Sequence, residues 1–205
     1  MIGIVDYGVG NLFSLKSSIK AIGFDTVVSG DRDELSACER IILPGVGAFG
    51  DAADKLRICG MDEYIKEEAA RGKPILGICL GMQLLFDEGL EYGCHKGLGL
   101  IPGRVCSLRE KLPDSYKVPH MGWNALNFPK DKEKSRLYKY TNDGDYVYFV
   151  HSFYATDCGS CVSATADYGF PVTASAEKGN VFGTQFHPEK SGDVGLKILK
   201  AFAEI

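Results

Sequence analysis

The sequence lacks two features that would direct it to a membrane or to nucleic acid. None of its apolar stretches approaches membrane-spanning length. Its 23 basic and 27 acidic residues give a net charge of −4, without a long run of either sign. We therefore expect neither a membrane nor a nucleic acid as partner. The chain opens directly on the strand-like segment 1–6, without a basic segment or an apolar signal core, so we expect a cytoplasmic protein.

Metal and cofactor motifs are also missing or incomplete. The seven cysteines are scattered without the spacing of a disulfide framework, which fits a reducing compartment. Cys158 and Cys161 form a lone C-x-x-C without the second pair of a zinc ribbon, so 158–161 is interpreted as a turn between two strands. Gly8 and Gly10 could open a dinucleotide fingerprint, but Phe13 stands where the third glycine belongs. We expect no metal and no cofactor.

Strand-like and helical patterns alternate along the first 90 residues. The apolar runs 2–5, 26–28, 40–43 and 74–78 predict strands, and the spacing of apolar residues in 12–22, 62–71 and 80–86 predicts helices. Such alternation is typical of a parallel sheet covered by helices on both faces.

The second half is richer in strand-like segments. These are 105–108, 146–155, 161–166, 172–176 and 181–186, with a hairpin turn at 177–180 and a closing helix at 195–202. At 205 residues and 45% hydrophobic, the chain can bury a full core. We predict one α/β domain over 1–205, with a largely parallel central sheet and extra antiparallel strands in the second half.

A cysteine lies between a buried strand and a helix. In Gly77-Ile-Cys79-Leu-Gly81 the glycines stand two residues before and two after Cys79, the layout of the hydrolase G-x-S-x-G elbow. A thiol at a helix N-terminus lies at the positive end of the helix dipole, which favours the thiolate that attacks a carbonyl. The next backbone N–H, that of Leu80, can donate to an oxyanion. The competing interpretation is a small buried hydrophobic residue, the usual role of a free cysteine.

A thiol nucleophile needs a base, and four histidines are available. His187 is followed by Pro188 and Glu189. Pro188 biases His187 toward an extended conformation, in which residues two apart point to the same side. Glu189 could then orient the imidazole as the third member of a triad. A His-x-Glu sequence is also common as a plain surface pair.

A glycine-rich loop, 44–47, follows the strand at 40–43. Open parallel sheets place their ligands at the carboxyl ends of strands, and glycines there let bare backbone N–H groups face a substrate. An ordinary turn has the same composition.

Taken together, loop 44–47, the elbow 77–83 and His187-Pro-Glu189 resemble the class I, triad-type glutamine amidotransferases, in that family's order and over essentially the whole chain. Within this family the sequence motifs resemble those of the HisH-type glutaminase subunits of imidazole glycerol phosphate synthase. The segments that carry this resemblance are 6–12, 44–47, 97–102, 120–124, 149–152 and 187–191.

The resemblance implies a role for each matching residue. Cys79 would attack the side-chain amide carbon of glutamine, His187 would protonate the departing ammonia, and Glu189 would orient His187. The backbone amides of Leu80 and of Val46 or Gly47 would stabilise the oxyanions, and Gln83, Ser152 and Phe153 match positions that hold glutamine.

The resemblance also implies a heterodimer with a HisF-type (βα)₈-barrel cyclase. That subunit would use the ammonia to make imidazole glycerol phosphate and aminoimidazole carboxamide ribonucleotide in L-histidine biosynthesis. Asn11, Trp123, Tyr148 and Lys190 match positions at or near the cyclase-facing surface; packing in the core is the alternative for Trp123 and Tyr148.

Other functions remain open at this point. One is a glutaminase paralogue that serves another synthase or sugar modification, although loop 44–47 and the segment 121–124 argue against anthranilate, aminodeoxychorismate or guanylate synthesis. Others are a non-catalytic flavodoxin-like binding module, which would not need His187 and Glu189, and a cysteine peptidase.

Overall fold

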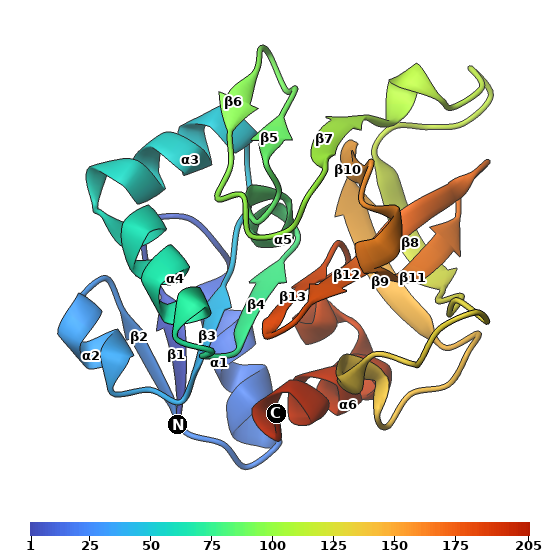
Figure 1. Ribbon diagram of the computed structural model, residues 1–205. Helices are drawn as coiled ribbons and strands as arrows, with labels where there is room; N and C mark the ends of the chain where they lie inside the picture. The colour runs from blue at the N-terminus through green and yellow to red at the C-terminus, as the bar shows by residue number, and fades with distance from the viewer.

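The computed structural model describes residues 1–205 and is built around one seven-stranded sheet (Figure 1). Its strand order is β11-β12-β13-β4-β3-β1-β2. The parallel strands are β1 (Ile2–Val5), β2 (Thr26–Ser29), β3 (Arg40–Leu43), β4 (Ile75–Ile78) and β13 (Val181–Thr184). β12 (Pro171–Lys178) and β11 (Val162–Asp167) extend the sheet antiparallel. The predicted fold class and the hairpin turn between β12 and β13 are confirmed.

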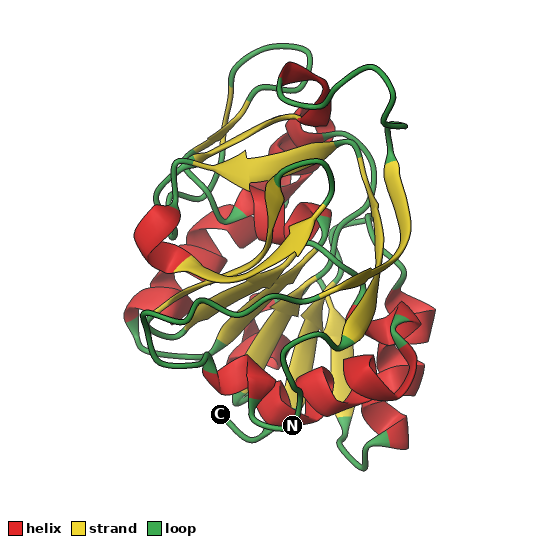
Figure 2. Ribbon diagram, turned by 90° about the vertical axis from the view of Figure 1, so that its right-hand side faces the viewer, coloured by secondary structure: helices red, strands yellow, loops and turns green.

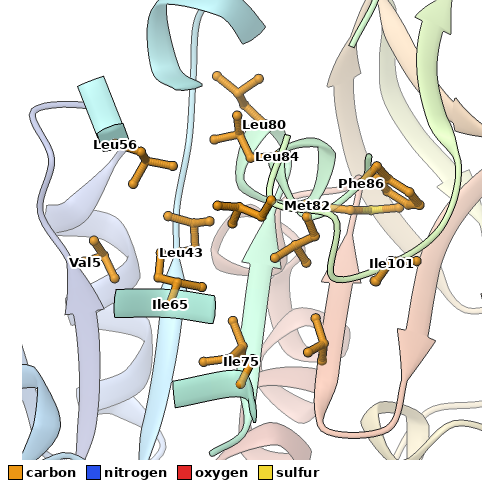
Figure 3. Close-up of a cluster of buried hydrophobic side chains, with 14 of the residues drawn as sticks. Val5, Leu43, Leu56, Ile65, Ile75, Leu80, Met82, Leu84, Phe86 and Ile101 are labelled. Carbon is orange, nitrogen blue, oxygen red and sulfur yellow. The ribbon is translucent and has the colours of Figure 1, made fainter. Parts of the chain in front are cut away.

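Helices pack on both faces of this sheet, as Figure 2 shows from the side. They are α1 (Leu12–Ala21), α2 (Arg32–Ser36), α3 (Phe49–Ile58), α4 (Met61–Ala70), α5 (Leu80–Leu84) and α6 (Gly192–Ala203). Alternate strand residues point to opposite faces. Val5, Leu43 and Ile75 therefore join the cluster under α3 and α4 shown in Figure 3, whereas Ile4 and Leu76 pack in the cluster that contains residues of α1 and α6. No helix is both long enough and apolar enough to cross a membrane.

Two smaller sheets flank the main one. The first has the order β10-β7-β5-β6 and the second pairs β8 with β9. Their strands are β5 (Glu88–Gly89), β6 (His95–Lys96), β7 (Arg104–Ser107), β8 (His120–Ala125), β9 (Tyr146–His151) and β10 (Phe153–Thr156). In Figure 1, β5 and β6 lie at the upper end of the main sheet, where β4 runs into α5.

The single strand predicted over 146–155 is wrong, because it is two strands in two different sheets. β9 pairs with β8, and β10 pairs with β7. Ser152 separates them, and its carbonyl accepts the N–H of Leu108 at 2.9 Å. Both halves are apolar, so local composition could not reveal a break that the pairing partners impose.

The predicted helix over 80–86 is too long, and two helices were not predicted. α5 ends at Leu84, after which the N–H groups of Leu85 and Phe86 bond three residues back, to Met82 and Gln83, in a tightened turn. α3 was missed because its buried face includes Ala52 and Ala53, which give a weak apolar signal. α2 is only five residues long. Residues 158–161 contain a short 3₁₀ turn, η3 (Gly159–Cys161), between β10 and β11, as expected.

Candidate active site

The strand-to-helix turn at Cys79 has a backbone that only close packing can maintain. Cys79 has φ 55° and ψ −112°, outside the regions that non-glycine residues usually occupy. A Cβ on Gly81 would overlap the carbonyl of Leu43, and one on Gly77 would lie 2.6 Å from the carbonyl oxygen of Gly81. The two glycines therefore let β3, β4 and α5 meet, and the predicted elbow is present.

The thiol of Cys79 is held among polar groups, although it is only 8% exposed. Its backbone N–H donates to the carbonyl of Thr184 on β13 at 2.7 Å. The Sγ atom lies 3.8 Å from Nε2 of Gln185 and 3.9 Å from the carbonyl oxygen of Val150. These polar neighbours hold the thiol at the inner end of the site, while Cys79 also packs at the edge of the buried apolar cluster that contains residues of α1 and α6.

His187 and Glu189 form a buried pair. Nδ1 of His187 lies 2.8 Å from Oε1 of Glu189, and both side chains are 3% exposed. Burial lowers the pKa of His187, but its contacts with Cys79 and Glu189 outweigh that effect and raise the pKa to about 9. The imidazole is therefore protonated at neutral pH, and an imidazolium facing Cys79 stabilises a thiolate.

The predicted reason for this pairing is wrong in part. His187 is extended, with φ −100° and ψ 99°, but Pro188 begins a 3₁₀ turn, η4 (Pro188–Lys190). The turn, and not a continuous extended segment, brings Glu189 back toward the imidazole. Proline suits this position because its fixed φ matches the first residue of a helical turn and its missing N–H is not needed there.

A cavity of about 400 Å³ opens over Cys79. Most residues that the sequence singled out line it: Val46, Gly47, Cys79, Leu80, Gln83, Ser152, Phe153, His187 and Lys190. Glu189 lies behind His187, and Asn11, Trp123 and Tyr148 do not line the cavity. The thiol, the imidazole and the loop 44–47 thus share one cavity of a size suited to a small substrate.

Sequence reasoning missed Glu91, His151 and Gln185. Glu91 lines the cavity and accepts the backbone N–H of Phe49, at the start of α3, at 2.7 Å. Gln185 is fully buried, and its Oε1 accepts a hydrogen bond from Gln83 at 2.9 Å. Gln185 stands two residues before His187, a position that could have drawn attention to it; no local pattern indicated Glu91.

The remaining residues that the sequence singled out lie around η4. The rings of Trp123 and Tyr148 are 6.1 Å apart in an edge-to-face arrangement, and Trp123 is 55% exposed. Tyr148 is tied to the segment after His187, because its N–H donates to Oγ of Ser191 at 2.9 Å. Asn11 caps α1, which packs against η4. The interpretation of Trp123 as a core residue is wrong.

The α/β fold and a cysteine elbow beside a buried His–Glu pair point to one class of protein. The family model described as Glutamine amidotransferase class-I matches residues 3–204. The chain belongs to this family, the class I glutamine amidotransferases.

Relatives narrow the assignment within that class. The imidazole glycerol phosphate synthase subunit HisH of Geobacillus sp. (strain WCH70) is 49% identical over 100% of this chain and 97% of its own length. The HisH subunit of Listeria monocytogenes serotype 4a is 47% identical over 100% of this chain and 96% of its own length. This chain is thus a HisH-type member of the family.

Solved structures agree on the fold. PurLQS from Thermotoga maritima superposes with a TM-score of 0.74 at 23% identity and covers 99% of this chain and 97% of its own.

Proposed function

We propose that this chain is the glutaminase subunit of an imidazole glycerol phosphate synthase in histidine biosynthesis, acting in the cytoplasm. It hydrolyses glutamine to glutamate and ammonia. The proposal is carried by the elbow thiol of Cys79, which shares a cavity with the buried His187–Glu189 pair, in a chain whose HisH relatives match it over its whole length. Seven free cysteines agree with a reducing compartment.

The first half-reaction uses the thiolate and the imidazolium together. Sγ of Cys79 attacks the amide carbon of glutamine, and the carbonyl electrons move to oxygen. When the tetrahedral intermediate collapses, the C–N bond breaks, His187 gives its proton to the leaving nitrogen, and a glutamyl thioester and ammonia result. Glu189 accepts the Nδ1–H of His187, which leaves Nε2 free for this transfer.

The second half-reaction reverses the role of His187. The imidazole, now neutral, takes a proton from water as the oxygen attacks the thioester carbon. The second tetrahedral intermediate expels the thiolate and releases glutamate. The first residue of α5 is Leu80, whose N–H has no acceptor within the helix and can donate to both oxyanions. An amide of Val46 or Gly47 supplies the second donor.

Substrate recognition follows from the charges of the lining. Free glutamine carries an α-ammonium group, and Glu91 is the one Asp or Glu side chain that lines the cavity. We assign Glu91 to that ammonium group. The amide nitrogen of Gln83 already donates to the carbonyl of Phe153 at 3.1 Å and to Oε1 of Gln185, so Gln83 offers its oxygen to glutamine. Backbone groups of Ser152 and Phe153 complete the contacts.

The partner is a HisF-type (βα)₈-barrel cyclase, and the docking surface lies around η4. Ammonia released into water would be protonated and lost as a nucleophile, so it must pass directly to the second subunit. Trp123 and Tyr148 form an aromatic pair on this surface, and aromatic residues are common at the centres of interfaces. Lys190 belongs to η4, which contacts both β9 and the helix α1 that Asn11 caps.

The test is glutamate release by the purified chain, measured alone and with a histidine-pathway cyclase plus its nucleotide substrate. We expect stimulation by the cyclase, and a loss of roughly a thousandfold or more in Cys79→Ala. Cys59→Ser, at an exposed free thiol, is the matched control and should be fully active. A rate of glutamine hydrolysis that the cyclase does not change would indicate that this glutaminase serves another synthase. No hydrolysis in either condition would overturn the proposal.

A further inference from the structure

Two buried histidines, one of which lines the cavity, have no part in the reaction described above. His120 on β8 and His151 on β9 face each other across the two-stranded sheet and are 3% and 5% exposed. Nδ1 of His120 lies 3.0 Å from Nε2 of His151, and Nδ1 of His151 lies 2.8 Å from the carbonyl oxygen of Phe153. A series of hydrogen bonds between buried polar side chains fixes the local structure, provided that every group in the series has a partner.

The contacts determine which nitrogen of each ring carries the proton. A carbonyl oxygen only accepts, so Nδ1 of His151 carries a proton, and in the neutral ring Nε2 is then an acceptor. Nδ1 of His120 must then donate to that Nε2, and Nε2 of His120 accepts the amide N–H of Asn124 at 3.3 Å. The amide group of Asn124 is itself oriented, because Nδ2 donates to the carbonyl of Asp167 and Oδ1 accepts the N–H of Ala125, both at 2.8 Å.

The same geometry excludes two other roles for these histidines. The nitrogens of the two rings point at each other at hydrogen-bonding distance, which leaves no room for a metal ion between them. Both nitrogens of His151 are engaged, so this ring is not free to act as a second base. His120 is also stacked on Phe149 and on Tyr168, with ring centroids 4.7 and 4.1 Å apart, so it cannot turn away easily.

This series of hydrogen bonds ends at Phe153, where glutamine is expected to bind. The carbonyl of Phe153 accepts from His151 and also from Gln83 at 3.1 Å. The amide nitrogen of Gln83 also donates to Oε1 of Gln185, and the amide nitrogen of Gln185 donates to Sγ of Cys79. The two donors fix the plane of the peptide bond after Phe153, and with it the segment 151–153 between β9 and β10.

We propose that His120 and His151 are positioning residues of the glutamine site: a pair of neutral imidazoles, each in its Nδ1–H tautomer, that holds the segment 151–153 against Gln83. This inference rests on the proposed function, because that function assigns glutamine to Ser152, Phe153 and Gln83. Protonation of His151 at Nε2 would set two N–H groups against each other and break the hydrogen bond between the two rings.

The surroundings of both rings favour the neutral form. Burial lowers the pKa of His120 to about 4. Burial, aided by the nearby His120 and His187, lowers the pKa of His151 to about 3, against the opposing effect of the Phe153 carbonyl. The pair therefore stays neutral at physiological pH beside the cationic His187.

The first experiment is ¹⁵N NMR of the histidine-labelled chain, with His120→Phe to assign the signals. We expect both rings in the Nδ1–H tautomer and neutral from pH 8 down to pH 5.5. An Nε2–H tautomer at either ring, or titration with a midpoint between pH 6 and 7, would overturn the inference. This experiment needs no turnover, so it decides the state of the pair even if the proposed function fails.

The second experiment is steady-state glutamine hydrolysis by the complex with the cyclase. His120→Phe keeps a flat ring against Phe149 and Tyr168 but removes the donor to His151, and we expect KM for glutamine to rise about tenfold with kcat within about threefold. His120→Asn places an amide N–H near the Nδ1 position and should recover part of that loss.

His95→Phe, a ring substitution outside the cavity, is the matched control and should leave both constants unchanged. An unchanged KM in a folded His120→Phe, or a loss confined to kcat, would overturn the positioning role. Failure of the wild-type complex to turn over glutamine would instead count against the proposed function.

Discussion

At the scale of single residues, the chemistry depends on groups that water does not reach. Oε1 of Glu189 holds the imidazole of His187, while its Oε2 is buried without a hydrogen-bond partner. A buried carboxylate interacts strongly with the one cation beside it, because little solvent screens the pair. This pairing helps to raise the pKa of His187 against the effect of its burial.

Glu189→Gln tests that dependence. The neutral amide removes one of the contacts that raise the pKa of His187 and can hold the wrong tautomer, so we expect kcat to fall about a hundred- to ten-thousandfold. Ammonia departure needs the protonated imidazole, so wild-type kcat/KM should decline as the pH rises through about 9. In the variant this alkaline limb should move to lower pH.

The readout for Glu189→Gln is the pH profile of glutamate release. Glu204→Gln, which alters only the exposed contacts of Glu204 with Lys139 and Tyr140 outside the cavity, serves as control and should keep the wild-type profile. An alkaline limb that stays in place in Glu189→Gln would show that Glu189 does not set the proton affinity of His187.

At the scale of elements, the elbow is a junction of three backbones. β3, β4 and α5 come together at Gly77 and Gly81, where any side chain would overlap a carbonyl group. The positive φ of Cys79 adds strain, which the packing of these elements must offset. The elbow is therefore sensitive to a single methyl group.

Gly81→Ala should destabilise the fold by about 3 kcal/mol, because the new methyl group must push the carbonyl of Leu43 away. Gly159→Ala is the matched control, since nothing lies within 4 Å of its added Cβ. Urea unfolding of both variants measures the difference. Equal stability of the two would mean that the elbow can widen without cost.

At the scale of the whole molecule, the fold places the cavity next to the surface around η4 that we propose as the docking surface. η4 carries Glu189, which pairs with His187, and Lys190, which lines the cavity, and Trp123 lies close to Gly192 at the start of α6. Binding of a partner over this surface would press on the segment that holds His187. The arrangement provides a direct physical route by which a cyclase could affect glutamine hydrolysis.

Trp123→Ala should weaken binding of the cyclase about tenfold or more, because an exposed Trp at the centre of an interface contributes strongly. The stability of the free chain should change little, since the side chain is 55% exposed. Tyr140→Ala alters an aromatic residue that contacts Glu204 near the far end of α6 and should leave binding unchanged. Calorimetric titration of each variant with the cyclase measures the affinity; full affinity in Trp123→Ala would move the docking surface elsewhere.

The sequence by itself determined the parallel half of the fold and the elbow. Apolar runs and glycine spacing are local properties, so β1, β3, β4 and the turn at Cys79 could be read from neighbouring residues. The pairing of His187 with Glu189 was also predictable, although the 3₁₀ turn that produces it was not.

Only the tertiary structure decided the rest. It divided 146–155 between two sheets, because each half found a different partner strand. It also brought Glu91, His151 and Gln185 to the cavity and its thiol, from β13 and the small sheets or the turns beside them. Contacts between residues so far apart in sequence depend on how strands pair and pack, and no local pattern of side chains encodes that.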